Sequence, residues 1–123
     1  MKKIACFLFI SLILSVLVNA QVLNSPDGKF TMTFGLQTDG TPTYMLSFKN
    51  KPVIKNSKLG LELKDDKQSL LDNFEIARID TSSFDETWKP VWGEVTSIRN
   101  YYKEMAVSLH QKESDRILII RFR

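Results

Sequence analysis

Cysteine and histidine are almost absent from this sequence, since each occurs once in 123 residues. The cysteine, Cys6, lies in an apolar segment near the N-terminus. If that segment is removed, no disulfide can form and no thiol can act as a nucleophile. The lone histidine, His110, makes neither a metal cluster nor a Ser-His-Asp motif and is expected at the surface of a hairpin. Disulfide scaffolds and cysteine enzymes are therefore excluded.

A strong excess of charge of one sign is also lacking. The sequence has 17 Lys and Arg residues against 14 Asp and Glu residues. Two of the basic residues, Lys2 and Lys3, lie at the extreme N-terminus, and without them the surplus is a single positive charge. No basic stripe remains that would neutralise a row of phosphates, so nucleic acid is not an expected partner.

The N-terminus has the pattern of an export signal. Lys2 and Lys3 precede an apolar run over residues 4–18, and Val18-Asn19-Ala20 is a small-x-small cleavage pattern. About 7–15 apolar residues are typical of a secretory signal, whereas a membrane-spanning helix needs about 20. We predict a signal peptide over residues 1–20 with cleavage after Ala20. The exported product, residues 21–123, is then one secreted or periplasmic domain without a membrane segment.

The rest of the chain alternates apolar and polar residues with a period of two. This alternation covers residues 30–34 and 43–49, with a Thr-Asp-Gly turn signal at 38–40 between them. Because one apolar face packs on a core and Asp-Gly supplies a turn, the pattern predicts a β-hairpin. Further strands are predicted at 52–55, 59–64, 74–80, 102–111 and 116–123, with a polar loop at 64–73. Seven or eight strands without an amphipathic helix indicate an all-β fold, an antiparallel sandwich or barrel.

The most unusual stretch is FDETWKPVWGEVTSIRNYY, residues 84–102. Its candidate site residues are two tryptophans four apart and the acids around them: Trp88, Trp92, Asp85, Glu86 and Glu94. Pro90 would break a helix, so the two indoles are expected on one face of an extended strand. Aromatic ring faces and nearby carboxylates suit a carbohydrate ligand.

Core packing is the alternative interpretation of the same stretch. Each indole would then bury about 150–250 Å² between two sheets, and the acids would be solvated turn residues. Pro90 and Gly93 could also break the alternation, which would bury Trp88 and present Trp92 beside Glu94. We favour this mixed arrangement. Arg99 and Arg121 are expected to pair with acids across strands.

Four segments carry a resemblance to a known family: SPDGKFTMTF (25–34), PTYMLSFKNKPVIKNSKLGLEL (42–63), FDETWKPVWGEVTSIRNYYKEMAVSL (84–109) and DRILIIRFR (115–123). They resemble the N-terminal domain of glycoside hydrolase family 97, above all the starch-utilisation α-glucosidases of gut bacteria. The resemblance covers essentially all of residues 21–123.

The resemblance implies a β-supersandwich of the galactose-mutarotase-like type, incomplete here at the C-terminal end. Full-length members continue into a (β/α)8 barrel and a small β-domain, and they hydrolyse α-glucosidic bonds with inversion or α-galactosidic bonds with retention. Their active site uses calcium, and its carboxylates lie mainly in the barrel. We therefore expect no catalytic residue, metal site or cofactor within this chain, while the parent enzyme would bind α-linked oligosaccharide.

Three functions remain open at this point. The first is the N-terminal fragment of a secreted family 97 enzyme, inactive alone, in which the candidate residues face carbohydrate or the absent barrel. The sequence ends inside its strongest β-forming run, RILIIRFR, so further strands are expected to follow. The second is a free-standing carbohydrate-binding module with the tryptophans as a platform. The third is a structural domain whose last strand pairs with a partner.

Overall fold

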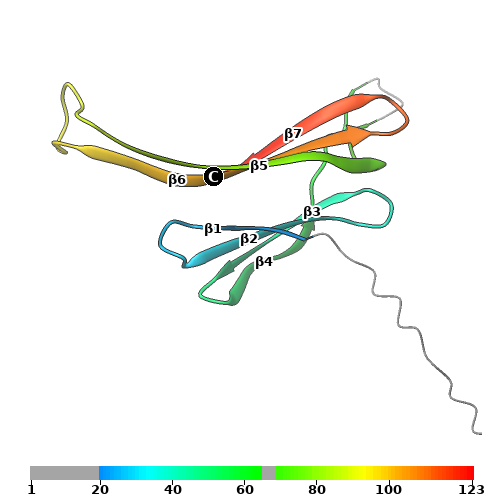
Figure 1. The fold of residues 1–123 in the computed structure, drawn as a ribbon, viewed down its shortest axis with the longest axis horizontal. Coiled ribbons are helices and arrows are strands. Elements are labelled where there is room, and N and C mark those ends of the chain that lie inside the picture. Colours follow the sequence, from blue (N-terminus) through cyan, green and yellow to red (C-terminus); the bar gives the residue numbers. More distant parts are fainter. Residues whose placement is uncertain (1–19, 65–68) are drawn as a thin grey trace, which may run out of the picture.

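The chain folds into two antiparallel β-sheets that lie face to face (Figure 1). A computed structural model describes residues 20–64 and 69–123. The first sheet has the order β1-β2-β3-β4, and the second has the order β5-β6-β7. The strands of the first are Gln21–Asn24, Phe30–Leu36, Pro42–Phe48 and Lys51–Lys58, and those of the second are Phe74–Trp88, Ile98–Gln111 and Arg116–Phe122. No helix occurs among the described residues, so the prediction of an all-β antiparallel sandwich is confirmed.

The predicted first hairpin is formed by β2 and β3, which pair from Phe30 with Phe48 to Leu36 with Pro42. Its turn is closed by the Asp39 carboxylate, which accepts a hydrogen bond from the Thr41 backbone N–H at 2.9 Å. Gly40 has a φ of +79°, and a Cβ there would lie 2.5 Å from the Phe74 nitrogen. Glycine is therefore required both by the backbone conformation and by the close approach of β5.

The core lies between the sheets and consists of a small set of apolar side chains. Those buried are Met32, Phe34, Phe74, Met105, Val107 and Leu109. They come from alternate positions, because only one face of each strand meets the opposite sheet. Phe122 of β7 reaches across to Phe34, with 5.9 Å between the ring centroids.

The predicted strand at 59–64 is not formed. Residues 59–64 connect the two sheets, and only an isolated bridge joins Leu61 to Leu70. Leu59 packs against the core, whereas Leu61 and Leu63 are exposed. The alternating leucines have the sequence pattern of a strand, but no neighbouring strand pairs with them to form a ladder. The acidic pair of the predicted loop, at 65–66, lies outside the described residues.

The predicted signal peptide also lies outside the described residues, apart from Ala20. No helix over residues 20–64 and 69–123 is long and apolar enough to cross a membrane.

Candidate interaction surface

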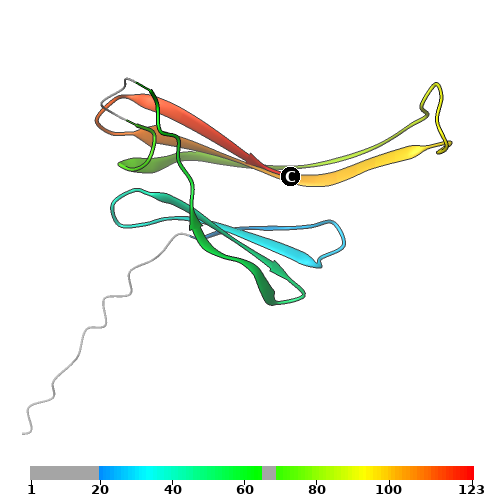
Figure 2. The same ribbon diagram turned by 180° about the vertical axis from the view of Figure 1, so that it is seen from behind.

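Strands β5 and β6 extend well beyond the sandwich as a two-stranded ribbon (Figures 1 and 2). They pair along their full length, from Phe74 with Gln111 to Trp88 with Ile98. Strand β7 accompanies β6 only as far as the pair Met105–Phe122. We call the ribbon beyond that pair, with its connecting loop, the arm (residues 82–104), and the loop at its end the tip (residues 89–97).

One face of the arm carries a row of apolar and aromatic side chains. Phe84 lies opposite Tyr102 with stacked rings, 5.3 Å apart between centroids and inclined by 26°. Trp88 lies opposite Ile98 on the same face, because positions an even number of residues apart share a face. The pair Glu86–Asn100 lies between these two pairs. We call this the aromatic face.

The opposite face of the arm continues the core side of the sheet, and its centre is an ion pair. Arg99 donates through Nε and Nη2 to the two carboxylate oxygens of Asp85, at 2.8 and 2.6 Å. These bonds hold the pKa of the Asp85 carboxyl below its usual range. The guanidinium also lies over the Tyr101 ring, 4.8 Å from the centroid. The predicted cross-strand pairing of Arg99 is confirmed, and Asp85 is committed to it.

The tip presents its side chains to solvent. Trp92 is 89% exposed and Val91 is fully exposed. Trp88 is the last residue of β5 and Trp92 belongs to the tip, so the prediction that both indoles lie on one strand face is wrong. In the favoured mixed arrangement, the exposure of Trp92 is confirmed, whereas the burial of Trp88 in the core is wrong, since Trp88 is 47% exposed. The physical reason is that both tryptophans lie far beyond the end of β7, in the part of the ribbon that extends past the four-stranded sheet (Figure 1).

The five candidate residues are therefore divided among three places. Glu86 and Trp88 share the aromatic face, Asp85 lies on the other face, and Trp92 and Glu94 lie in the tip. Phe84, Asn100 and Tyr102 also belong to the aromatic face, and they were not among the predicted site residues. Their even spacing from Trp88 and Ile98 was visible, but the register that places the two strands opposite each other was not.

A second set of ion pairs lies at the base of the arm, around a buried carboxylate. The carboxylate of Glu104, a residue only 9% exposed, accepts hydrogen bonds from Arg121, at 2.9 Å, and from Arg123. The bond from Arg123, followed by that from Arg121, lowers the pKa of Glu104. Arg123 also lies over the Tyr102 ring, 5.2 Å from its centroid. The predicted cross-strand pairing of Arg121 is confirmed.

The single histidine is tied into the β6–β7 hairpin. Its Nε2 lies 2.7 Å from the Asp115 carboxylate and its Nδ1 lies 3.2 Å from Glu75. These contacts, that with Asp115 having the larger effect, raise the pKa of His110.

Over residues 20–64 and 69–123, His, Cys, Asp and Glu side chains form no group of three that could hold a metal ion.

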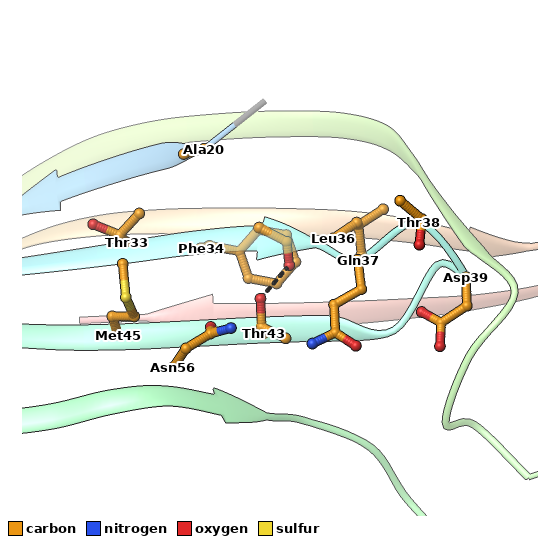
Figure 3. A pocket seen from close by; sticks show the side chains of 11 residues that line it. Ala20, Thr33, Phe34, Leu36, Gln37, Thr38, Asp39, Thr43, Met45 and Asn56 are labelled. Carbon is orange, nitrogen blue, oxygen red and sulfur yellow. Dashed lines mark hydrogen bonds between the residues drawn. The ribbon is translucent and has the colours of Figure 1, made fainter. Parts of the chain in front are cut away.

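A hollow of about 550 Å³ lies on the four-stranded sheet (Figure 3). Thr33, Gly35, Thr43 and Met45 line it from the face of β2 and β3 opposite to the core. A Cβ at Gly35 would meet only Thr43 Oγ1, at 3.8 Å. Thr43 donates to the Gly35 carbonyl at 3.2 Å. The only acid in the lining, Asp39, is committed to the turn, so the hollow holds no acid–base pair.

This architecture is similar to that of known glycoside hydrolases. The family model for the glycosyl-hydrolase 97 N-terminal domain matches residues 23–123. A glycoside hydrolase family 97 enzyme from Pseudoalteromonas sp. strain K8, solved in complex with panose and with acarbose, is 30% identical with a TM-score of 0.74. The match covers 83% of this chain and 15% of that one.

A more distant structure agrees in fold. A beta-arabinopyranosidase matches 84% of this chain at 20% identity and a TM-score of 0.72, over 16% of its own length. At that identity the likeness extends to the fold alone. The present chain thus spans about 15% of the length of the solved enzymes it matches. With the family model matching nearly all of residues 21–123, the chain belongs to glycoside hydrolase family 97 as its N-terminal domain.

Proposed function

We propose that this domain is the non-catalytic N-terminal part of a secreted enzyme that hydrolyses α-linked glycosides, and that the arm holds the catalytic part of that enzyme in place. The observation that carries the proposal is the exposed apolar surface of the arm. Phe84 is 40% exposed, Trp88 47% and Ile98 38% on the aromatic face alone.

The physical argument is that a two-stranded ribbon is marginal in water without a surface to pack on. Contiguous exposed apolar patches on soluble proteins mark interaction sites. The solved relatives are several times longer than this chain, so a large body of additional protein accompanies this domain in them. A surface provided by that body would bury the aromatic face and stabilise the arm.

The family relationship supports the proposed substrate class. The Pseudoalteromonas enzyme was solved with panose and with acarbose, both oligosaccharide-type ligands. Secretion is supported by the apolar N-terminal run and the Val18-Asn19-Ala20 pattern. Calcium, which the resemblance implies for full-length members, would take most of its ligands from the catalytic part.

A domain exchange tests this function. Residues 21–123 would replace the matching segment of the Pseudoalteromonas enzyme, and hydrolysis of an aryl α-glucoside would be measured. We expect the exchanged enzyme to be active and residues 21–123 alone to be inactive. Replacing Phe84 and Trp88 together with serine should lower the melting temperature and the activity of the exchanged enzyme, because the docking surface becomes polar.

Val53→Ser is the matched control, because Val53 is 59% exposed but lies on β4, away from the arm. It should leave both quantities unchanged. The proposal would be contradicted if the exchanged enzyme were inactive. It would also be contradicted if replacing Phe84 and Trp88 with serine changed neither its melting temperature nor its activity. Turnover by residues 21–123 alone, abolished by Glu94→Gln, would contradict the absence of catalysis.

A carbohydrate-binding module is the second candidate, favoured by the exposure of Trp88 beside Glu86 on the aromatic face. Titration of residues 21–123 with panose, followed by indole fluorescence, separates the two functions. Saturable binding that Trp88→Ala abolishes would support the module. The docking function predicts no saturation.

A further inference from the structure

We propose that the hollow on the outer face of the four-stranded sheet binds a short, neutral α-linked oligosaccharide. Gly35 and Thr43, which lie opposite each other on β2 and β3, form its floor, and the side-chain amides of Gln37 and Asn56 are its polar partners. The inference rests on the proposed function for the class of ligand. It adds to that function a binding place that is separate from the arm.

The first observation is a glycine inside a regular strand. Glycine weakens a strand interior, and it often marks a bulge, a barrel corner, or the close approach of a backbone or a ligand. The β2–β3 register has no shift, so Gly35 lies at no bulge, and an open four-stranded sheet has no barrel corner. Its φ is not positive, and a Cβ there would meet only Thr43 Oγ1, at the ordinary contact distance of 3.8 Å. Among the described residues no backbone requires a glycine here, which leaves room for a ligand as its reason.

The second observation is a set of polar side chains around that floor that have no partner. Gln37 lines the hollow from the β2–β3 connection and Asn56 from β4, and Figure 3 shows Thr43 between their side chains. Within residues 20–64 and 69–123, neither amide makes a side-chain hydrogen bond, and the Thr33 hydroxyl makes none. A side-chain amide both donates and accepts, so it can bind a hydroxyl group in either role.

The third observation concerns size and charge. The hollow, at about 550 Å³, lies within the range of about 300–1,000 Å³ that is typical of small-molecule sites. Its lining contains no Lys or Arg, and its one acid, Asp39, is held by the Thr41 backbone N–H. An anionic ligand would therefore find no cation there. Met45, which is 41% exposed, offers an apolar surface to C–H groups. Uncharged hydroxyls next to C–H faces are the chemistry of an oligosaccharide.

The place of the hollow separates it from the other candidate surface. The β2–β3 connection lies at the end of the sandwich away from the arm (Figure 1). Both tryptophans lie in the arm, so indole fluorescence does not report on binding in the hollow. Ala20 also lines the hollow, but it supplies only a methyl group, and the predicted cleavage after it removes no polar partner.

Chemical-shift mapping tests the proposal. Residues 21–123, labelled with nitrogen-15, are titrated with panose, and the backbone amide shifts are followed. We expect saturable shifts around Gly35, Thr43 and Asn56, and we expect them to persist in Trp88→Ala. Gly35→Val should abolish them, because its side chain fills the hollow. Its melting temperature should not fall, since β-branched residues favour strands.

Ser47→Val is the matched control, because Ser47 lies on the same face of β3 but outside the lining. It should bind panose like the unaltered chain. Asn56→Ala, at an exposed position, is the second variant if Gly35→Val does not fold. It should weaken binding about tenfold through the loss of one hydrogen bond.

Three results would overturn the inference. The first is a set of shifts that grow with panose without saturating. The second is unchanged binding in folded Gly35→Val or in Asn56→Ala. The third is saturable shifts confined to the arm and lost in Trp88→Ala, which would assign the binding to the aromatic face. The assay needs no turnover and no catalytic part, so its failure is distinguishable from failure of the domain exchange.

Discussion

The two halves of the β5–β6 hairpin have similar sequence patterns and opposite environments. Near the sandwich, Phe74 is 3% exposed and Val107 and Leu109 are fully buried. In the arm, Trp88 and Tyr101 are 47% and 43% exposed. Apolar residues are plentiful in both halves, so composition does not separate them. The difference is that the four-stranded sheet covers one half, whereas the part of the other half beyond Tyr102 has no covering strand among the described residues.

This difference has an energetic consequence. Fully burying a large apolar side chain contributes about 1.5–3 kcal/mol relative to leaving it exposed. The covered half gains this contribution at several positions, and the arm gains little. The arm therefore depends on the stability of the sandwich until a partner covers it, and substitutions in the two halves should have unequal effects.

The largest effect is expected from truncating a covered side chain. Leu109→Ala should lower the free energy of unfolding by about 2–5 kcal/mol, because it removes buried methyl groups and leaves a cavity. The whole free energy of unfolding of a small domain is only about 5–15 kcal/mol. Ile98→Ala in the same strand, at a position 38% exposed, should cost about 0.5 kcal/mol. Urea denaturation measures both, and equal losses would remove the distinction between the two halves.

Gly40 and Gly93 allow the covered half and the arm to be compared by a change in backbone conformation. A Cβ at Gly40 would lie 2.5 Å from the Phe74 nitrogen, whereas one at Gly93 in the tip would meet nothing within 4 Å. Both have positive φ, so alanine is strained at each by roughly 1–3 kcal/mol. Gly40→Ala adds a clash with β5 and should lower the melting temperature more than Gly93→Ala. A larger loss at Gly93 would show that the tip is packed in solution.

An intermediate effect is expected from pH at the base of the arm. The folded pKa of Glu104 is lowered by Arg123 and Arg121, so its stabilising contribution is present above the ordinary value of 4.5. That contribution is lost as pH falls below 4.5 through the folded pKa. Glu104→Gln should lower the melting temperature at pH 7 and reduce its fall between pH 5 and pH 3. Glu94→Gln in the tip is the control and should follow the unaltered chain.

His110 should make stability depend on pH in the opposite direction from Glu104. Its folded pKa is raised by Asp115 and Glu75, so its contribution is complete below the ordinary value of 6.5 and is lost as pH rises through the folded pKa. The unaltered chain should lose melting temperature above pH 6.5, and His110→Gln should remove that dependence. A parallel loss in the variant would assign it to another group.

The smallest effects are expected in the arm itself. Trp88→Ala and Trp92→Ala should each change the free energy of unfolding by about 0.5 kcal/mol or less, because both indoles are exposed. Solubility should improve as the apolar patch shrinks. Thermal melts decide the matter, and a loss comparable with that of Leu109→Ala in either variant would restore core packing for that indole.

Much of this molecule was predictable from local pattern. The hairpin of β2 and β3 follows from alternation over 30–34 and 43–49 with Asp39-Gly40 between them, because side-chain period and turn chemistry are local properties. Strands β5 and β6 were predicted only over 74–80 and 102–111, whereas they extend to Trp88 and back to Ile98, because their pairing there depends on a register that local pattern does not show. Residues 59–64 show the limit of alternation, which marks a strand only where a neighbouring strand exists.

The sequence by itself therefore determined the fold class, the period of the strands, the place of the main turns and the family. Only the tertiary structure decided which faces are covered, and hence that Trp88 and Trp92 are exposed, that Asp85 is held by Arg99, and that Phe84 joins Tyr102 on one face. The physical reason is that alternation assigns a side chain to a face of its strand. Whether that face is buried depends on the register and extent of other strands, which are set by contacts between residues far apart in the chain.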